Sequence, residues 1–170
     1  MIEFQNVSYA HSKGYGVSNL NMSMTEGEFA FLIGPTGSGK TTLMRLVYFD
    51  LLPDTGQVRV NGFFSNKILK RHIPTARKSI GMVFQDYKLL SDRTLFENIS
   101  LPLHVLGFKT KEIKSRVEEV LDLVGLLGKE DHLSFELSGG EQQRACLARA
   151  IIKEPAVSYT HLTLPTSYAV

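Results

Sequence analysis

The spacing of apolar residues predicts strands near the start of the chain. Ile2, Phe4 and Val7 follow a loose alternation, and residues 17–24 (VSNLNMSM) alternate more clearly between apolar and polar positions. Residues 29–33 (FAFLI) form a continuous apolar run, which is typical of a strand that is buried on both faces. We therefore expect two alternating strands followed by one fully buried strand.

Two more strands are predicted further along the chain. Residues 56–62 (GQVRVNG) indicate a short strand that ends in an Asn-Gly turn, and residues 80–85 (IGMVFQ) indicate another buried strand. Residues 67–78, which lie between them, are basic and irregular. We expect this intervening stretch to be a solvated surface segment.

Helical patterns separate and follow these strands. A helix is predicted over residues 41–49, and Thr94 with Glu97 matches the capping-box pattern that opens another helix. A final helix is predicted over residues 140–153, with Pro155 ending it. A further helix carries one apolar stripe at helical spacing, made of Ile113, Val117, Val120, Leu121 and Val124. Strands that alternate with helices, with a helical insertion in the middle, favour an α/β fold.

Composition and charge exclude several classes of protein. The 170 residues are 43% hydrophobic and carry 19 basic against 17 acidic residues, a balance that does not indicate a nucleic-acid or lipid partner. Cys146 is the single cysteine, so an intrachain disulfide framework and a cysteine-based zinc site are excluded, and its helical position predicts a small buried core residue. The sequence shows neither a signal peptide nor an apolar run of membrane-spanning length. We expect a cytosolic protein, or one attached to a membrane through another protein.

A glycine-rich stretch carries the first chemical motif. The sequence GPTGSGKTT matches the phosphate-loop pattern G-x-x-x-x-G-K-[ST] between a predicted buried strand and a predicted helix. Glycines permit backbone angles that aim several N–H groups at an anion, and the helix N-terminus adds its positive end. Lys40 supplies a mobile charge for the outer phosphates, and the Thr41 hydroxyl is a ligand for Mg²⁺. The predicted nucleotide-binding residues are Gly34, Pro35, Thr36, Gly37, Ser38, Gly39, Lys40, Thr41 and Thr42.

A second motif lies in residues 137–144 (LSGGEQQR), immediately before the last predicted helix. A serine N-cap with a polar first turn accounts for Ser138 and Glu141, but not for the whole octet after a phosphate loop. The two motifs together, with Gln85 at the end of IGMVFQ, closely resemble the ATP-binding-cassette (ABC) ATPases over residues 1–157. The signature residues in this resemblance are Leu137, Ser138, Gly139, Gly140, Glu141 and Gln142.

The resemblance implies a fold, a substrate and an assembly. The fold is a P-loop NTPase of the ABC type, with a RecA-like core, an N-terminal antiparallel β subdomain and a helical signature subdomain at about residues 86–137. ATP is the implied substrate, with Mg²⁺ held at Thr41 and Gln85, and with Lys40 and Gln85 in catalytic roles. Two copies would pair as a homodimer through ATP, with the signature of one copy facing the γ-phosphate on the other.

The family also places an aromatic residue near the N-terminus, stacked on the adenine. His11 is the match by position, with Tyr9 close behind and Tyr15 as a further option. A surface aromatic residue is the alternative interpretation for each of the three, and we favour the role in adenine binding.

The sequence of residues 82–107 indicates which members of the family this chain resembles most. It is similar to cell-division members of the family, and lipoprotein-releasing and macrolide-exporter members share much of it. This resemblance implies an integral membrane partner and no nucleic-acid partner. It further implies a peripheral location on the cytoplasmic face of the inner membrane. It also implies that residues 86–90 and the following helical segment form a groove for a partner helix, whereas Leu95 is expected to be an ordinary packing residue.

The last residues depart from the family. After a proline such as Pro155, the family continues with an apolar strand that ends in the Walker B Asp-Glu pair. Here no acidic residue follows Glu154, and His161 comes too early to be the family's switch histidine. We expect residues 1–157 to be a partial ABC ATPase domain and residues 158–170 a non-native tail. The core strand would then be lost, and the chain would be marginally stable and inactive.

Two other interpretations remain open on the sequence. An ABC ATPase of DNA repair or translation is disfavoured, because residues 85–137 contain no heptads or cysteine cluster and the chain has no tandem cassette. A nucleotide-binding fragment without enzymatic activity is the other interpretation, and it describes the 170 residues themselves.

Overall fold

The computed structural model describes residues 1–11, 14–83, 87–154 and 157–160. The chain forms two compact units, Met1–Ile80 and Gly81–Val170. The Pro155 stop and Gln85, which both figured in the sequence patterns, lie outside the described residues.

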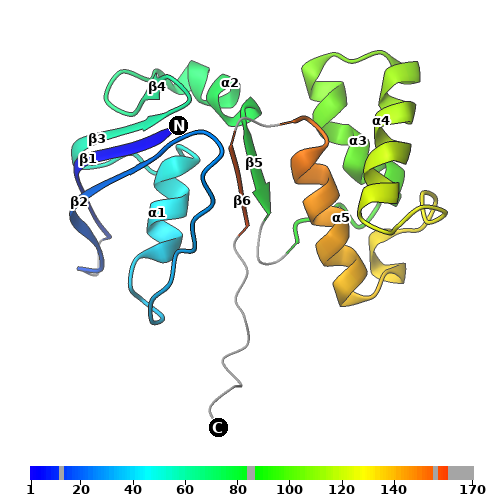
Figure 1. Cartoon of the computed structure of the whole chain (residues 1–170), viewed down its shortest axis with the longest axis horizontal. Coiled ribbons are helices and arrows are strands. Elements are labelled where there is room, and N and C mark those ends of the chain that lie inside the picture. The colour runs from blue at the N-terminus through cyan, green and yellow to red at the C-terminus, as the bar shows by residue number, and fades with distance from the viewer. Residues whose placement is uncertain (12–13, 84–86, 155–156, 161–170) are drawn as a thin grey trace, which may run out of the picture. The chain divides into compact units, whose positions relative to one another are not determined.

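The first unit is built on a four-stranded antiparallel sheet (Figure 1). Its strands, in the order β2-β1-β3-β4, are β2 (Gly16–Met24), β1 (Ile2–Ala10), β3 (Thr55–Val60) and β4 (Phe63–Phe64). In the central strand, Ile2 pairs with Met24 on one side and Val60 on the other. The alternation at Ile2, Phe4 and Val7 thus predicted a real strand, since all three side chains are buried.

The Asn-Gly turn predicted after residues 56–60 is confirmed. It joins β3 to β4, and both Asn61 (φ 47°) and Gly62 (φ 83°) are left-handed, as a tight hairpin turn requires. The helix α1 (Lys40–Val47) packs against β2 and β3 and buries Leu46 and Val47.

The prediction of a buried strand over residues 29–33 is wrong in this structure. Residues 28–35 have no regular secondary structure, and Phe29 and Ile33 are 82% and 88% exposed. A strand exists only where a neighbour completes its hydrogen-bond ladder, and no strand in the described part of the chain pairs with this segment. The exposed Phe29 and Phe31 rings pack edge to face instead, with centroids 5.0 Å apart.

Residues 67–78 are more ordered than the sequence predicted. They contain the 3₁₀ turn η1 (Lys70–His72) and the helix α2 (Ile73–Lys78), which has a proline in its first turn. Ala76 is fully buried, and Arg77 donates to the carbonyls of Tyr48 and Phe49 at 3.0 and 3.1 Å. These tertiary contacts, which charge patterning does not report, hold the segment in a helix.

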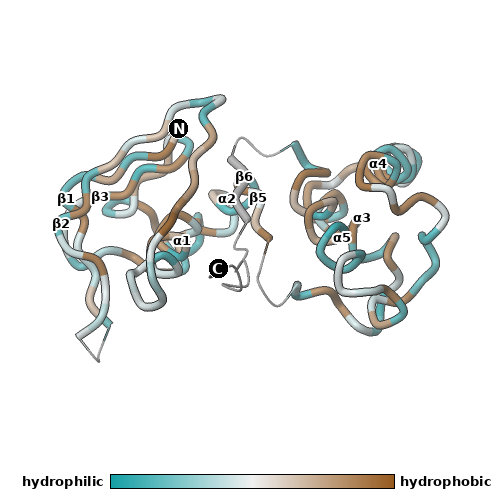
Figure 2. Tube along the Cα trace, turned by 60° about the horizontal axis from the view of Figure 1, so that its bottom comes forward, coloured by the Kyte–Doolittle hydropathy of each residue, from teal (hydrophilic) through white to brown (hydrophobic). Residues whose placement is uncertain are grey.

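Three helices form the core of the second unit. They are α3 (Leu95–Leu106), α4 (Thr110–Leu123) and α5 (Gly139–Ile151), and hydrophobic and hydrophilic positions alternate along them (Figure 2). The predicted stripe on α4 is confirmed, because its members lie in the core cluster with Leu95 and Ile99 of α3 and Ala145 and Ala148 of α5. Leu95 is therefore a packing residue, as predicted.

The unit also contains a short two-stranded sheet. Its strands are β5 (Ile80–Val83) and β6 (Val157–Thr160), which pair with each other. Val83 packs with Cys146 and Ala150 of α5, so Cys146 is the small buried core residue that was predicted. The expectation that the strand after residue 157 is lost is wrong: backbone pairing to β5 forms it even though its sequence carries no acid. The 3₁₀ turn η2 (Ser134–Glu136) completes the elements.

Candidate nucleotide-binding site and signature motif

The phosphate-loop motif, residues 34–42, extends into the first turn of α1, which begins at Lys40 (Figure 1). Gly37 and Gly39 have φ values of 85° and 90°, in the left-handed region that glycine adopts without steric cost. Gly39 has a second constraint, because a Cβ atom there would lie 2.9 Å from Cγ1 of Val17. The loop conformation thus depends on glycine at both positions.

Lys40 is the first residue of α1, and its side chain folds back over the loop. Its ammonium donates to the carbonyls of Gly34 and Pro35 at 2.6 and 2.7 Å, and Oγ of Ser38 lies 3.4 Å away. The contacts are exposed, so the cation is held above the loop by acceptors that an anion can replace. This arrangement places one mobile positive charge at a helix N-terminus, where an anion is stabilised.

The two threonines after Lys40 differ in their surroundings. Thr42 is buried and its hydroxyl lies 3.0 Å from Nε2 of His11, whereas Thr41 is exposed. The His11 ring also meets the Tyr9 ring edge to face, with centroids 4.9 Å apart. The structure therefore brings His11 and Tyr9 beside the start of α1, while exposed Tyr15 makes no such contact among those the structure describes.

The signature motif opens α5 in the second unit. Ser138 is the N-cap, and it forms a capping box with Glu141: the Glu141 amide donates to Oγ of Ser138 at 3.4 Å, and the Ser138 amide donates to the Glu141 carboxylate at 2.8 Å. Leu137 is buried in the core, and its carbonyl accepts from Nε2 of Gln142 at 3.0 Å. The capping box and the Gln142 bond together hold the first turn of α5, which includes Gly139.

Lys129 completes this network, although the sequence patterns did not single it out. Its ammonium bonds to the Glu141 carboxylate, which also accepts from Oγ of Ser138 at 2.8 Å. The Lys129 hydrogen bond, followed by those from Ser138, lowers the pKa of Glu141 to about 2. Glu141 is consequently ionised, and it orients Ser138 across the physiological range of pH.

Residues 87–90, which follow Gln85 in the chain, are held by side chains from three elements. Asn98 of α3 and Ser134 of η2 bond to Leu90, and Arg149 of α5 bonds to the carbonyls of residues 87 and 88. The sequence patterns missed Asn98 and Arg149. The sequence offered one indication of this role: Asn98 is a polar residue on the apolar helix face that Leu95 and Ile99 define.

Two helices thus begin at the sequence motifs: α1 begins within the phosphate loop, and α5 begins with Gly139 and Gly140 after the Ser138 cap. The ABC transporter family model matches residues 17–159, which include both.

The chain belongs to the ABC transporter family.

Curated relatives narrow the comparison. The cell division ATP-binding protein FtsE of Mycobacterium tuberculosis is 47% identical over 88% of this chain and 65% of its own length. The FtsE proteins of Streptococcus pneumoniae and Escherichia coli are 45% and 41% identical over 92% of this chain, and over 69% and 71% of their own lengths. The chain therefore spans about two thirds of the length of these relatives.

Solved structures agree on the fold of the ABC cassette. A dimeric bacterial ABC transporter cassette, MJ0796, superposes with a TM-score of 0.85 at 30% identity, covering 94% of this chain and 73% of the other. A dimeric post-hydrolysis state of the same cassette, bound to ADP and Pi, gives the same values. The α/β fold of the ABC P-loop NTPases is confirmed.

Two further observations concern membranes and metals. No described helix of this cassette is both long and apolar enough to cross a bilayer. Within the part of the chain that the structure describes, no group of three or more His, Cys, Asp or Glu side chains is placed to hold a metal ion. Gln85, the predicted second Mg²⁺ ligand, and Asp86 lie outside the described residues.

Proposed function

We propose that this cassette binds ATP at its phosphate loop and, in the full-length protein, hydrolyses it to drive an integral membrane partner of the FtsX type in cell division. The observation that carries the proposal is the Lys40 ammonium, held over left-handed glycines at the start of α1. The identity of 41–47% to FtsE proteins supports the assignment to cell division. Attachment to the cytoplasmic face of the inner membrane would then come from the partner.

The residues of the loop suit a triphosphate. Loop amides and the helix N-terminus would surround the phosphates, and Lys40 would leave its carbonyl acceptors for the β/γ oxygens. Exposed Thr41 offers one hydroxyl to Mg²⁺, an ion that binds mainly through substrate phosphates and water and so needs few protein ligands. When bound, the ion would neutralise phosphate charge. His11 and Tyr9, beside Thr42, are the proposed adenine contacts.

The signature motif serves a second copy of the chain in this proposal. Ser138 already caps its own helix, and the Gly139 and Gly140 amides lie at the positive end of α5. The dimers of MJ0796 support pairing of two cassettes. Each ATP would thus take ligands from the phosphate loop of one copy and the signature of the other, and nucleic acid has no part in the assembly.

Binding is tested with the 170-residue chain itself. A fluorescent ATP analogue in the presence of Mg²⁺ should bind wild type and Lys70→Ala equally, since Lys70 is an exposed lysine of the same unit outside the loop. Lys40→Ala should weaken binding at least about tenfold, because one charge-assisted contact to phosphate is lost. Equal affinity of Lys40→Ala and wild type would overturn the proposal.

Hydrolysis is a separate expectation. Phosphoryl transfer to water requires an aligned water as well as charge neutralisation, and no acidic residue follows Glu154 in this sequence. We expect residues 1–170 to bind ATP without turnover above background. A family-type strand, Asp-Glu pair and C-terminal lobe placed after Val157 should restore turnover and raise thermal stability. ATP turnover by the unmodified chain that Lys40→Ala abolishes would contradict this expectation.

A further inference from the structure

Residues 87–90, named here the 87–90 segment, have an unusual backbone. Tyr87 and Lys88 are consecutive non-glycine residues with φ values of 57° and 52°. Each left-handed residue of this kind costs about 1 kcal/mol or more, so such a conformation persists only where its surroundings impose it.

Side chains of α5 hold the first half of the segment. The Arg149 guanidinium donates from its two terminal nitrogens to the carbonyls of Lys88 and Tyr87, at 2.7 and 2.8 Å. Sγ of Cys146, buried one turn earlier on the same helix, donates to the Tyr87 carbonyl at 2.9 Å. The two strained residues are therefore bonded directly to the helix that the signature motif opens.

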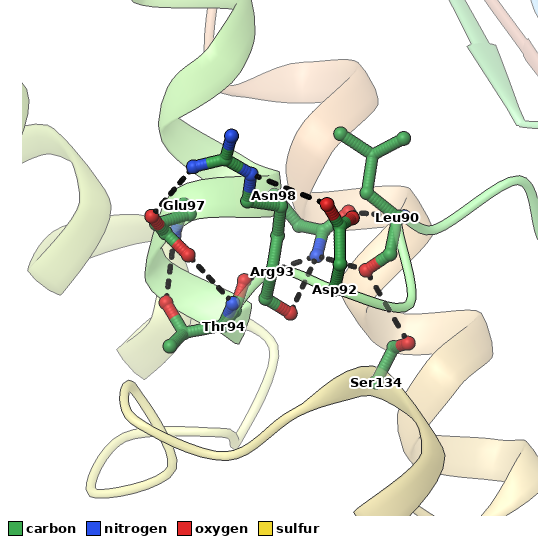
Figure 3. Close-up of polar contacts among 7 residues, drawn as sticks. All are labelled: Leu90, Asp92, Arg93, Thr94, Glu97, Asn98 and Ser134. Atoms are coloured by element: carbon green, nitrogen blue, oxygen red, sulfur yellow. Dashed lines mark hydrogen bonds and ion pairs between the residues drawn. The ribbon is translucent and has the colours of Figure 1, made fainter.

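The second half is held by α3. Asn98 is 1% exposed, and its amide makes a two-point contact with Leu90: Oδ1 accepts from the Leu90 amide at 2.7 Å, and Nδ2 donates to the Leu90 carbonyl at 3.0 Å (Figure 3). Nδ2 also lies 3.2 Å from the Arg93 carbonyl and 3.0 Å from that of Thr94. A buried amide with both ends satisfied fixes the backbone that it contacts.

Two further observations place the segment close to the start of the signature motif. Oγ of Ser134, four residues before Ser138, donates to the same Leu90 carbonyl at 3.4 Å (Figure 3). The Tyr87 hydroxyl lies next to Gly139, 4.0 Å from where a Cβ atom on that glycine would be. The side chain of Leu90 points away from these bonds and is 43% exposed.

We propose that Asn98 and Arg149 are positioning residues that lock the 87–90 segment to the signature helix α5, so that a displacement of Leu90 moves Ser138 with it. Both side chains act through the backbone of the segment. The consequence for turnover rests on the proposed function, in which Ser138 serves the ATP of a second copy.

Hydrogen–deuterium exchange on the 170-residue chain without nucleotide tests the lock by itself. Asn98→Ala should accelerate exchange about tenfold in residues 87–93 and in the first turn of α5, and leave α4 unchanged, because buried amide bonds of the segment are lost. Ser100→Ala is the matched control: Ser100 is also buried on α3, and its hydroxyl donates to the Glu97 carbonyl of its own helix.

Arg149→Ala tests the other end, and Arg149→Lys, which keeps the charge and one donor group, should rescue part of the effect. If Asn98→Ala does not fold, Arg149→Ala provides the exchange test in its place. Wild-type exchange in residues 87–93, an unchanged first turn of α5, or faster exchange that includes α4 would each overturn the proposal. The last result would make these residues general determinants of stability.

Turnover in the full-length protein provides the functional measurement. Asn98→Ala should lower kcat about tenfold and leave KM for ATP unchanged, because the phosphate loop is untouched and only the placement of Ser138 is affected. A raised KM with unchanged kcat would overturn the proposal. Failure of the proposed function would instead appear as equal ATP binding by wild type and Lys40→Ala, with the exchange result unaffected.

Discussion

Gly39 shows at the scale of one residue how the phosphate loop depends on its sequence. Its φ of 90° is costly for any other residue, and a Cβ atom would meet Val17 at 2.9 Å. We expect Gly39→Ala to lower the free energy of unfolding by about 2 kcal/mol, from left-handed strain plus displacement of Val17. Binding of the ATP analogue should be lost with it.

Gly62→Ala is the matched control for that variant. Gly62 has a similar φ of 83° but open space around the position of a Cβ atom. In urea unfolding, Gly62→Ala should lower the free energy of unfolding by about 1 kcal/mol, from left-handed strain alone, because no neighbour is displaced. ATP binding should be unchanged. Equal effects of the two substitutions on stability and binding would show that the contact with Val17 is irrelevant.

Lys129 and Glu141 form the second residue-scale case. Because the folded pKa of Glu141 is about 2, below the ordinary value of 4.5, its contribution to stability is fully present above pH 4.5 and is lost as the pH falls toward 2. Lys129→Met removes the largest cause of the shift. The pKa of Glu141 should rise toward 4.5, and acid unfolding should begin at higher pH.

A carboxyl-carbon NMR titration of Glu141 checks this directly. The exposed Lys111 of α4 gives the control, Lys111→Met, which should leave the titration unchanged. The bonds from Ser138 remain in Lys129→Met, so some lowering of the pKa should persist. An unaltered pKa in Lys129→Met would mean that Ser138 alone depresses it.

Two helices of the second unit, α3 and α5, begin at a hydroxyl-bearing N-cap residue with a capping box. Thr94 and Glu97 form the predicted capping box of α3, with bonds of 3.2 and 2.9 Å, and the Thr94 amide bond lowers the pKa of Glu97. Thr94→Ala should destabilise the chain by about 1 kcal/mol. Urea unfolding measures the loss, and Thr94→Ser, which keeps the hydroxyl, should recover most of it.

Asn98, which bonds to the 87–90 segment, lies on the same helix as the Thr94 cap. The effect of the cap on the segment can be measured apart from that of Asn98. Thr94→Ala leaves the Thr94 carbonyl in place as an acceptor of Asn98. We therefore expect the exchange of residues 87–90 to stay near the wild-type rate in this variant. Faster exchange there would show that the start of α3 itself holds the segment.

For the whole molecule, the central expectation is that two copies pair around ATP. Ser138→Arg places a long cation where the signature would face the nucleotide of the partner, while the phosphate loop of the same copy is unchanged. ATP binding by the monomer should persist and ATP-driven pairing should disappear. Sedimentation of a hydrolysis-deficient full-length protein measures pairing, and equal dimer fractions for Ser138→Arg and its parent would count against this geometry.

The sequence by itself determined the features that depend on neighbouring residues. The stripe on α4, the capping box at Thr94, the Asn61–Gly62 turn and the two motifs were all predictable. Their physical basis is local, because a helical period, a cap or a left-handed turn involves residues within a few positions of one another. The serine cap of α5 was predictable for the same reason.

Tertiary structure decided what depends on partners far along the chain. Residues 29–33 have the composition of a buried strand but lack a paired neighbour, whereas residues 157–160 form a strand because β5 pairs with them. Arg149 bonds to a carbonyl 61 positions away, and Ser134 to one 44 positions away. Strand pairing and bonds from side chains to distant backbone are set by which segments meet in the fold, and no local pattern records that.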